Sequence, residues 1–178
     1  MITSLARTAA YGLTAFGAAA AVVAAAGSAS AAIDPSAYGI AAVGPRPLAA
    51  QPAVDWTSGA ALSAQSGPVT LGPVHLATVS VDAGDGFATS RLTGLDIAGH
   101  FIGTVTANCR DGATSLTSDG ARLEPGEQIP LPGLGTLTIG ATTTNTDTSR
   151  SITALTITLP APSGTEVITL GQARCGQG

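Results

Sequence analysis

The segment from Ser151 to Cys175 most strongly restricts what this chain can fold into. Its first half alternates Leu155, Ile157 and Leu159 with alanine and threonine. A period of two, with Ala154, Thr156 and Thr158 on the other face, indicates a half-buried antiparallel strand. Two prolines and a glycine in 160–164 break this strand, and a second strand-like run leads from Val167 to Cys175. The sequence therefore predicts a closing β-hairpin.

The rest of the chain repeats this pattern in shorter pieces. Apolar and threonine-rich runs recur about every 8 to 15 residues and are separated by Gly, Pro and Asp, as in an all-β sandwich or barrel. Beyond the first 32 residues no run has a convincing 3.6-residue apolar period, so no long helix is expected. The further strands are expected in 38–43, 69–71, 74–81, 92–97, 101–109, 113–117 and 135–142.

Two details of this prediction concern single segments. In the run 101–109, Phe101, Val105, Ala107 and Cys109 are expected on one apolar face. Residues 48–68 consist mainly of Ala, Ser, Gln, Gly and Pro, and are expected to form an irregular surface connection with room for one short strand near 60–64.

The N-terminal residues have the pattern of an export signal. A single Arg7 precedes the apolar run 9–26, and small residues then offer a cleavage site after Ala31 or Ala32. We expect a signal peptide over 1–32 and one secreted domain over 33–178, with no membrane attachment after cleavage. The alternative is a buried or transmembrane helix, because the run is close to the lower length limit for spanning.

Cys109 and Cys175 are the only cysteines. In an exported chain an isolated pair favours one disulfide, which here closes a loop of about 65 residues and contributes roughly 4 kcal/mol in the chain-entropy model. The alternative is two free buried thiols.

The charge composition excludes several classes of function. The chain has seven basic residues, all of them arginine, against eleven acidic ones, for a net charge of −4. Nucleic acids and anionic membranes require clustered cations, so neither is an expected partner. Without lysine there is no phosphate loop of the Walker type and no Schiff-base chemistry.

No residue pattern predicts a metal, a cofactor or a catalytic site. Asp82, Asp85 and Gly86 lack the alternating oxygens of a calcium loop and favour a glycine-rich turn. His75 and His100 are the only histidines, expected on a strand surface and in a turn. The chain has no Gly-x-Ser-x-Gly motif. The spacing selects no catalytic pair among Asp96, Asp119, Glu124, Glu127 and Glu166.

Trp56 is the one candidate ligand contact. It lies in the segment expected to be irregular, where an exposed indole face can bind a sugar. The alternative is a hydrophobic plug over the core, since tryptophan is usually largely buried.

Four motifs in order carry a resemblance to a known family. They are Ser36–Ile40, Thr104–Cys109, Ile129–Thr138 and Leu170–Gly176. Together they resemble the exported actinobacterial proteins of the choice-of-anchor P family. The resemblance implies a secreted or surface-displayed β-rich domain of no established activity, with the family's disulfide at Cys109 and Cys175, and it carries over no catalytic residue.

The chain ends three residues after Cys175, so a sorting signal or basic tail is not expected there. Release, or retention in the envelope by non-covalent contact, is favoured. We therefore expect an exported, non-enzymatic structural or interaction protein of the envelope or the extracellular space. Its partner would be a cell-wall polymer or another surface protein. The alternative is a secreted binding module for a polysaccharide or a small apolar ligand.

Overall fold

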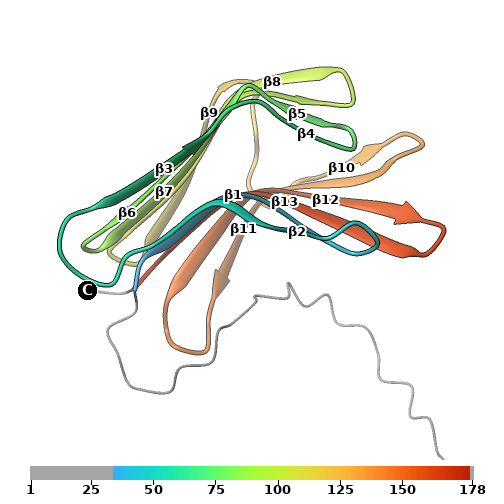
Figure 1. Cartoon of the computed structure of the whole chain (residues 1–178). Helices are drawn as coiled ribbons and strands as arrows, with labels where there is room; N and C mark the ends of the chain where they lie inside the picture. The colour runs from blue at the N-terminus through green and yellow to red at the C-terminus, as the bar shows by residue number, and fades with distance from the viewer. Residues whose placement is uncertain (1–33, 177–178) are drawn as a thin grey trace, which may run out of the picture. The chain divides into compact units, whose positions relative to one another are not determined.

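The computed structural model describes residues 34–176, and every regular element in them is a β-strand (Figure 1). The prediction of an all-β antiparallel domain is confirmed for this part of the chain, while the expected signal peptide lies outside it. The strands are β1 Ser36–Val43, β2 Leu48–Asp55, β3 Leu62–Ser66, β4 Val69–Leu71, β5 Val74–Leu76, β6 Thr78–Gly84, β7 Phe87–Ile97, β8 His100–Arg110, β9 Ala113–Gly120, β10 Gln128–Leu131, β11 Gly135–Thr144, β12 Arg150–Ala161 and β13 Gly164–Cys175.

The strands form two antiparallel sheets. The first sheet has the order β10-β11-β12-β13-β1-β2, so the predicted closing hairpin β12–β13 lies at its centre. In the second sheet β3, β6, β7, β8 and β9 follow one another. The short pair β4–β5 joins this sheet through β7, beyond the end of β6.

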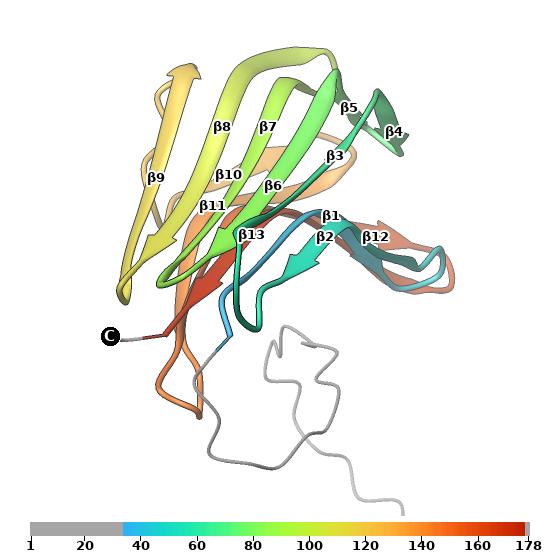
Figure 2. The same ribbon diagram turned by 60° about the vertical axis from the view of Figure 1, so that its left-hand side comes forward.

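The two sheets pack against each other around one core (Figure 2). Strand β13 contacts β7 and β8, and β1 contacts β6 and β7. Strands β2 and β3 also meet at the edge of the two sheets, which brings the sandwich close to a closed barrel. The apolar positions of the period-two runs supply this core, as expected for strands with one buried face.

A row of small residues crosses the first sheet. The paired residues before and after each position show that four small residues lie opposite one another on adjacent strands. They are Gly140 on β11, Ala154 on β12, Gly171 on β13 and Gly39 on β1. Side chains of the second sheet fill the space: a Cβ on Gly171 would lie 3.3 Å from Leu92 Cδ1. The row therefore lets the two sheets approach closely at their centre.

This row corrects one predicted face. Ala154 is fully buried like its neighbour Leu155, although it was expected on the threonine face. Gly140 and Gly171, on either side of it, have left-handed φ values of +61° and +65°, which interrupt the regular pleat. The alternation of β12 therefore changes phase at the small-residue row.

Phe101 is a second correction. Val105, Ala107 and Cys109 are buried as predicted, but the Phe101 side chain is 73% exposed. The register between β7 and β8 shifts near Leu95, and Gly103 has a φ of +98°. This β-bulge turns Phe101 away from the core, since one extra residue reverses the facing of a strand.

The segment 48–68 is a third correction, because β2 occupies its first part and it is not an irregular connection, whereas the short strand expected near 60–64 is present as β3. Both strands lie at sheet edges and are mostly exposed, so their side chains show no clear alternation. An edge strand also tolerates Pro52, whose missing N–H is not needed for a second neighbour.

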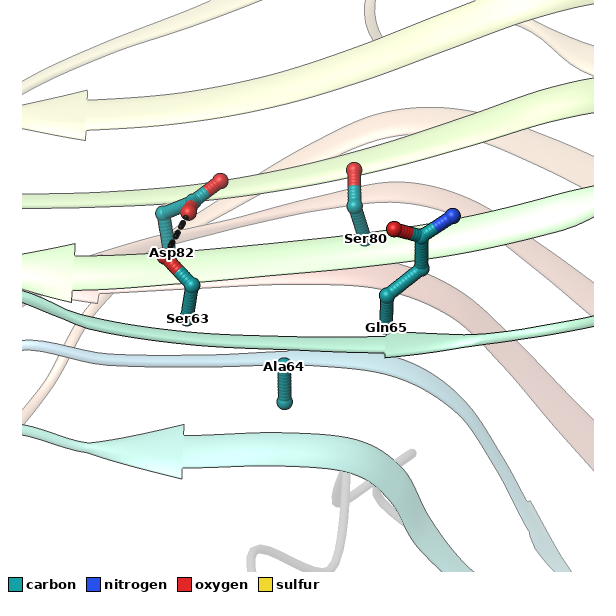
Figure 3. Close-up of a pocket in the computed structure, with 5 residues that line it drawn as sticks. All are labelled: Ser63, Ala64, Gln65, Ser80 and Asp82. Atoms are coloured by element: carbon teal, nitrogen blue, oxygen red, sulfur yellow. Dashed lines mark hydrogen bonds between the residues drawn. The ribbon is translucent and has the colours of Figure 1, made fainter.

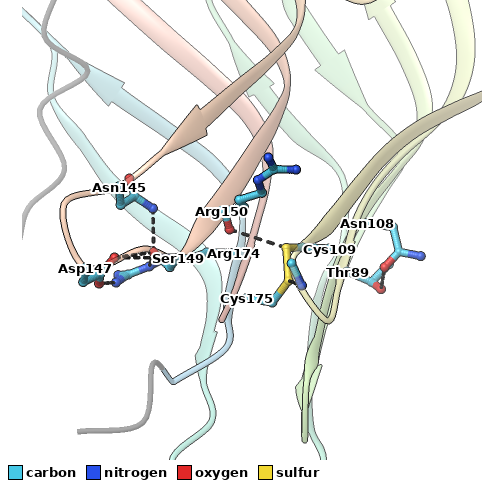
Figure 4. Close-up of a disulfide and its surroundings, with 10 residues drawn as sticks. Thr89, Asn108, Cys109, Asn145, Asp147, Ser149, Arg150, Arg174 and Cys175 are labelled. Carbon is cyan, nitrogen blue, oxygen red and sulfur yellow. Dashed lines mark hydrogen bonds and ion pairs between the residues drawn. A yellow bond between two sulfur atoms is a disulfide. The ribbon is translucent and has the colours of Figure 1, made fainter. Parts of the chain in front are cut away.

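The predicted disulfide is confirmed. Cys109 on β8 and Cys175 on β13 are bonded, with their Cα atoms 5.6 Å apart and both residues fully buried (Figure 4). The bond thus joins the second sheet to the first. Because Cys109 pairs with Ala88 near the β6–β7 turn, the disulfide lies at that end of the sandwich.

The polar hairpin between β11 and β12 is held by a cluster around Asp147 (Figure 4). Asp147 accepts hydrogen bonds from the Ser149 backbone and hydroxyl and pairs with Arg174 on β13. These Ser149 hydrogen bonds, with a contribution from the Arg174 charge, lower the pKa of Asp147 below its usual value.

Because the pKa of Asp147 is lower in the folded state, its carboxylate stabilises the domain above the unfolded-state pKa of about 3.9. That contribution is lost as the pH falls through the folded-state pKa. We expect Asp147→Asn to reduce the difference in urea midpoint between pH 7 and pH 3. Asp85→Asn, in the exposed β6–β7 turn, is the control. A pH dependence unchanged by Asp147→Asn would contradict the assignment.

Candidate functional site

The residues weighed as catalytic or metal ligands do not converge. Within 34–176 no three His, Cys, Asp or Glu residues are grouped so as to hold a metal ion, and no helix there is long and apolar enough to cross a membrane. His75 contacts Thr70, with Nδ1 3.2 Å from Oγ1, on the exposed face of β5. His100 is exposed at the start of β8.

Three of the five weighed carboxylates make local contacts. Asp96 accepts a hydrogen bond from the Gly99 backbone, and Asp119 accepts one from Thr104. Glu124 pairs with its near neighbour Arg122. A turn and a strand contact account for Asp96 and Asp119, an exposed ion pair accounts for Glu124, and Glu127 is an exposed residue before β10.

Trp56 follows β2 and packs against the core while remaining partly exposed. Its backbone N–H donates to the Pro35 carbonyl at 2.9 Å, which closes the start of β1 against the end of β2. The indole Nε1 is buried and has no hydrogen-bond partner. Trp56 lines neither of the two hollows described below.

The first hollow is a shallow depression of about 200 Å³ on the outer face of the second sheet (Figure 3). It lies over β3 and β6, where Ser63 Oγ donates to Asp82 Oδ1 at 2.5 Å. None of its lining residues is buried, so solvent can satisfy its polar groups. These residues are Ser63, Ala64, Gln65, Ser80 and Asp82.

The second hollow is larger and lies at one end of the sandwich. It measures about 440 Å³ and lies where four hairpin turns come together: 44–47, 72–73, 132–134 and 162–163. We call this part of the molecule the turn end; the four turns project toward the right of Figure 1. Loops at one end of a sandwich are a common place for binding residues. The lining residues are Arg46, Gly72, Pro73, Gly133, Leu134, Leu159, Pro160, Ala161, Pro162 and Glu166.

Glu166 is the unusual residue in this hollow. It occupies an inward position of β13, on the same side as Ile168 and Leu170, and is only 2% exposed. Its Oε2 accepts hydrogen bonds from Arg46, at 2.8 Å from Nη2 and 3.3 Å from Nε. Its Oε1 is buried and has no partner.

The position of Arg46 follows from the turn between β1 and β2. Gly44 in this turn has a φ of +132°, and a Cβ there would lie 2.6 Å from the Thr165 carbonyl oxygen. Only glycine allows the turn to lie this close to the start of β13. The turn thereby places Arg46 over the Glu166 carboxylate, while the Arg46 side chain remains 68% exposed.

The walls of the hollow are apolar and poor in hydrogen-bond donors. Pro73, Pro160 and Pro162 have no backbone N–H, and Leu134 and Leu159 add hydrocarbon surface. A buried carboxylate oxygen without a donor carries an uncompensated desolvation penalty. Glu166 is therefore a buried carboxylate that is paired through one oxygen only, beneath an apolar surface.

Exposed apolar side chains surround this hollow. Val43, Leu134 and Phe101 are 53%, 37% and 73% exposed. Val43 precedes the first turn, and the β7–β8 hairpin that carries Phe101 is tied to the hollow by Ala98 N–H, which donates to Pro73 at 2.8 Å. Exposed apolar side chains of this size are candidates for contact with a partner.

Among the ten lining residues only Glu166 and Arg46 have ionisable side chains. One ion pair in an apolar hollow suits the binding of a ligand better than acid–base chemistry, which needs a second group at the reacting atoms. Comparison of the chain with family models, with curated proteins and with solved structures found no match.

Proposed function

We propose that this protein is an exported, non-catalytic binding domain whose binding face is the turn end. The observation that carries the proposal is Glu166, a carboxylate that lines the hollow between turns from both sheets and has a buried Oε1 without a partner. Arg46 pairs with Oε2 alone, so Oε1 lacks the hydrogen bond that a buried carboxylate oxygen normally has. The hollow thus favours ligand binding over a purely structural role.

An extracellular location is supported by three observations. The disulfide is typical of proteins that work in oxidising compartments. The first 32 residues have the composition of a signal peptide. The four motifs that resemble the choice-of-anchor P family agree with this location. We propose the cell envelope as the place of action and a cell-wall polymer as the partner.

The turn end of such a domain would contact the envelope through its exposed apolar residues Val43, Leu134 and Phe101. We expect the secreted protein to co-sediment with the envelope fraction of the producing cells. The double variant Leu134→Ser/Phe101→Ser removes two large exposed apolar side chains from this end, and we expect it to weaken binding about tenfold.

Leu62→Ser is the matched control for this experiment. Leu62 is also an exposed apolar residue, at 45%, but it pairs with Ala83 near the β6–β7 turn, away from the turn end. It should leave co-sedimentation unchanged. If Leu62→Ser weakens binding as much as the double variant does, or if the wild-type protein does not co-sediment, the proposal is wrong.

A further inference from the structure

We infer that the free edge of β9 pairs with β9 of a second copy of this chain, so that the second sheet continues across a two-fold axis. Within 34–176, β9 is hydrogen-bonded to β8 only, and Figure 2 shows it at the left margin of its sheet with no strand beside it. An edge strand whose N–H and C=O groups are unpaired is a template for a further strand. This edge is separate from the turn end, so the inference goes beyond the proposed function.

The other edge strands in the described part of the chain are protected against such pairing. Strand β2 contains Pro52 and a register shift, and it contacts the short edge strand β3. Strand β10 has four residues, one of them Pro130, and β4 has only three residues. In contrast, β9 has eight residues without proline or lysine, and it pairs with β8 without a register shift. It therefore lacks the features that usually keep an edge strand from pairing.

The turn before β9 determines which of its backbone groups face this edge. Asp111 and Gly112 have left-handed φ values of 48° and 77° and form a two-residue hairpin turn. The residues that flank such a turn form a hydrogen-bonded pair, so Ala113 and every second residue after it point their N–H and C=O groups toward β8. The residues between them point these groups to the free edge. They are Thr114, Leu116 and Ser118.

A two-fold axis through Leu116 pairs these groups with their counterparts in a second copy. When Leu116 lies opposite Leu116 of the second copy, Thr114 lies opposite Ser118 of that copy, and about six backbone hydrogen bonds form. Even-numbered positions then meet even-numbered positions, so half-buried side chains stay on the inner face and exposed ones stay on the outer face. The register that satisfies the edge therefore also preserves the facing of both strands.

The side chains of β9 are complementary to themselves in this register. Ser115 lies opposite Thr117 of the second copy, and Asp119, the only charged residue of β9, lies opposite Ala113. No charged residue of the strand thus faces a like charge. Because the other described edge strands are protected, β9 can pair only with β9, and this symmetric pairing ends with two copies. A second copy is therefore the occupant that this edge fits.

Sedimentation equilibrium of the purified secreted protein tests the inference. We expect a monomer–dimer equilibrium in which the dimer fraction rises with protein concentration. Ser118→Pro removes an N–H that points to the free edge and is not used in the pairing with β8, so it should abolish the dimer. A wild-type protein that stays monomeric up to millimolar concentration, or that forms species larger than a dimer, would overturn the inference. A folded Ser118→Pro variant that still dimerises would overturn it as well.

Two matched charge variants test the register and decide the question if Ser118→Pro does not fold. Ser115→Lys/Thr117→Lys places like charges opposite each other in the dimer, whereas Ser115→Lys/Thr117→Glu places opposite charges there. Both positions are exposed, so either variant should fold, and we expect the first to dimerise about tenfold more weakly than the second. Net charge alone would give the reverse order, since two lysines reduce the charge of −4. Equal dimerisation or the reverse order would overturn the inference.

Discussion

Replacing Cys109 and Cys175 together by alanine is expected to lower the free energy of unfolding by about 4 kcal/mol. The two residues are 66 positions apart, so the disulfide removes much of the conformational freedom of the unfolded chain. Both residues are fully buried, and losing their sulfur atoms also removes contacts in the core. The total free energy of unfolding of a small domain is about 5–15 kcal/mol, so this loss is a large share of it.

Urea unfolding of the oxidised wild-type protein and the double variant measures this difference. As a control, wild-type protein that is reduced while unfolded and kept under reductant should unfold near the midpoint of the double variant. A difference below about 1 kcal/mol between oxidised wild type and double variant would show that the disulfide is not a main source of stability.

Gly39→Ala is expected to destabilise the domain by about 3 kcal/mol, at the upper end for overpacking of a core. Gly39 belongs to the small-residue row of the first sheet, and a Cβ there would overlap Val79 Cγ1 of the second sheet. The new methyl would also lie 3.0 Å from Pro52 Cδ and 3.1 Å from the Gln51 carbonyl oxygen. With neighbours on both sides, the sheets have to move apart.

Two further variants separate this clash from a general preference for glycine. Gly67→Ala introduces the same methyl where the new Cβ would have no atom within 4 Å apart from its chain neighbours, and it should change stability little. Val79→Ala empties the space that the methyl added at position 39 needs. In urea unfolding, the double variant Gly39→Ala/Val79→Ala should therefore lose less free energy of unfolding than the sum of the two single losses. The difference should be at least about 1 kcal/mol. Strict additivity would contradict the packing described.

The sequence predicts the all-β class, the closing hairpin and the disulfide because each depends on local or pairwise signals. Leu155, Ile157 and Leu159 alternate regularly, and only two cysteines are available to pair. The facings of Ala154 and Phe101 were not predictable in this way. Each depends on a change of strand phase that glycines allow, and glycine alone does not reveal where a bulge occurs.

The site was harder to predict than the fold. Glu166 was one of several carboxylates, and its importance comes from turns that are far apart in the sequence. One local signal was available: Glu166 shares the phase of Ile168 and Leu170, which places it on the inward face of its strand. Trp56, which looked like the better candidate, lines neither hollow described here.

The exposure of the two charged partners bears on how much the Glu166–Arg46 pair contributes to stability. Arg46 is 68% exposed and can be solvated without a partner, whereas Glu166 is 2% exposed. Removing the buried member of the pair leaves no buried charge behind, so the usual penalty for breaking a buried ion pair does not apply. On this account Glu166 contributes little to the stability of the fold, and a carboxylate in such a position suits a binding residue.

The free energy of unfolding of Glu166→Met at neutral pH tests this central claim most directly. Methionine is apolar, flexible and similar in length, and the hollow has room for it. We predict that its free energy of unfolding equals that of the wild-type protein or exceeds it by up to about 1 kcal/mol, because an unpartnered buried oxygen is removed. A loss of more than about 2 kcal/mol would show that the Glu166–Arg46 pair stabilises the fold, and would contradict the claim.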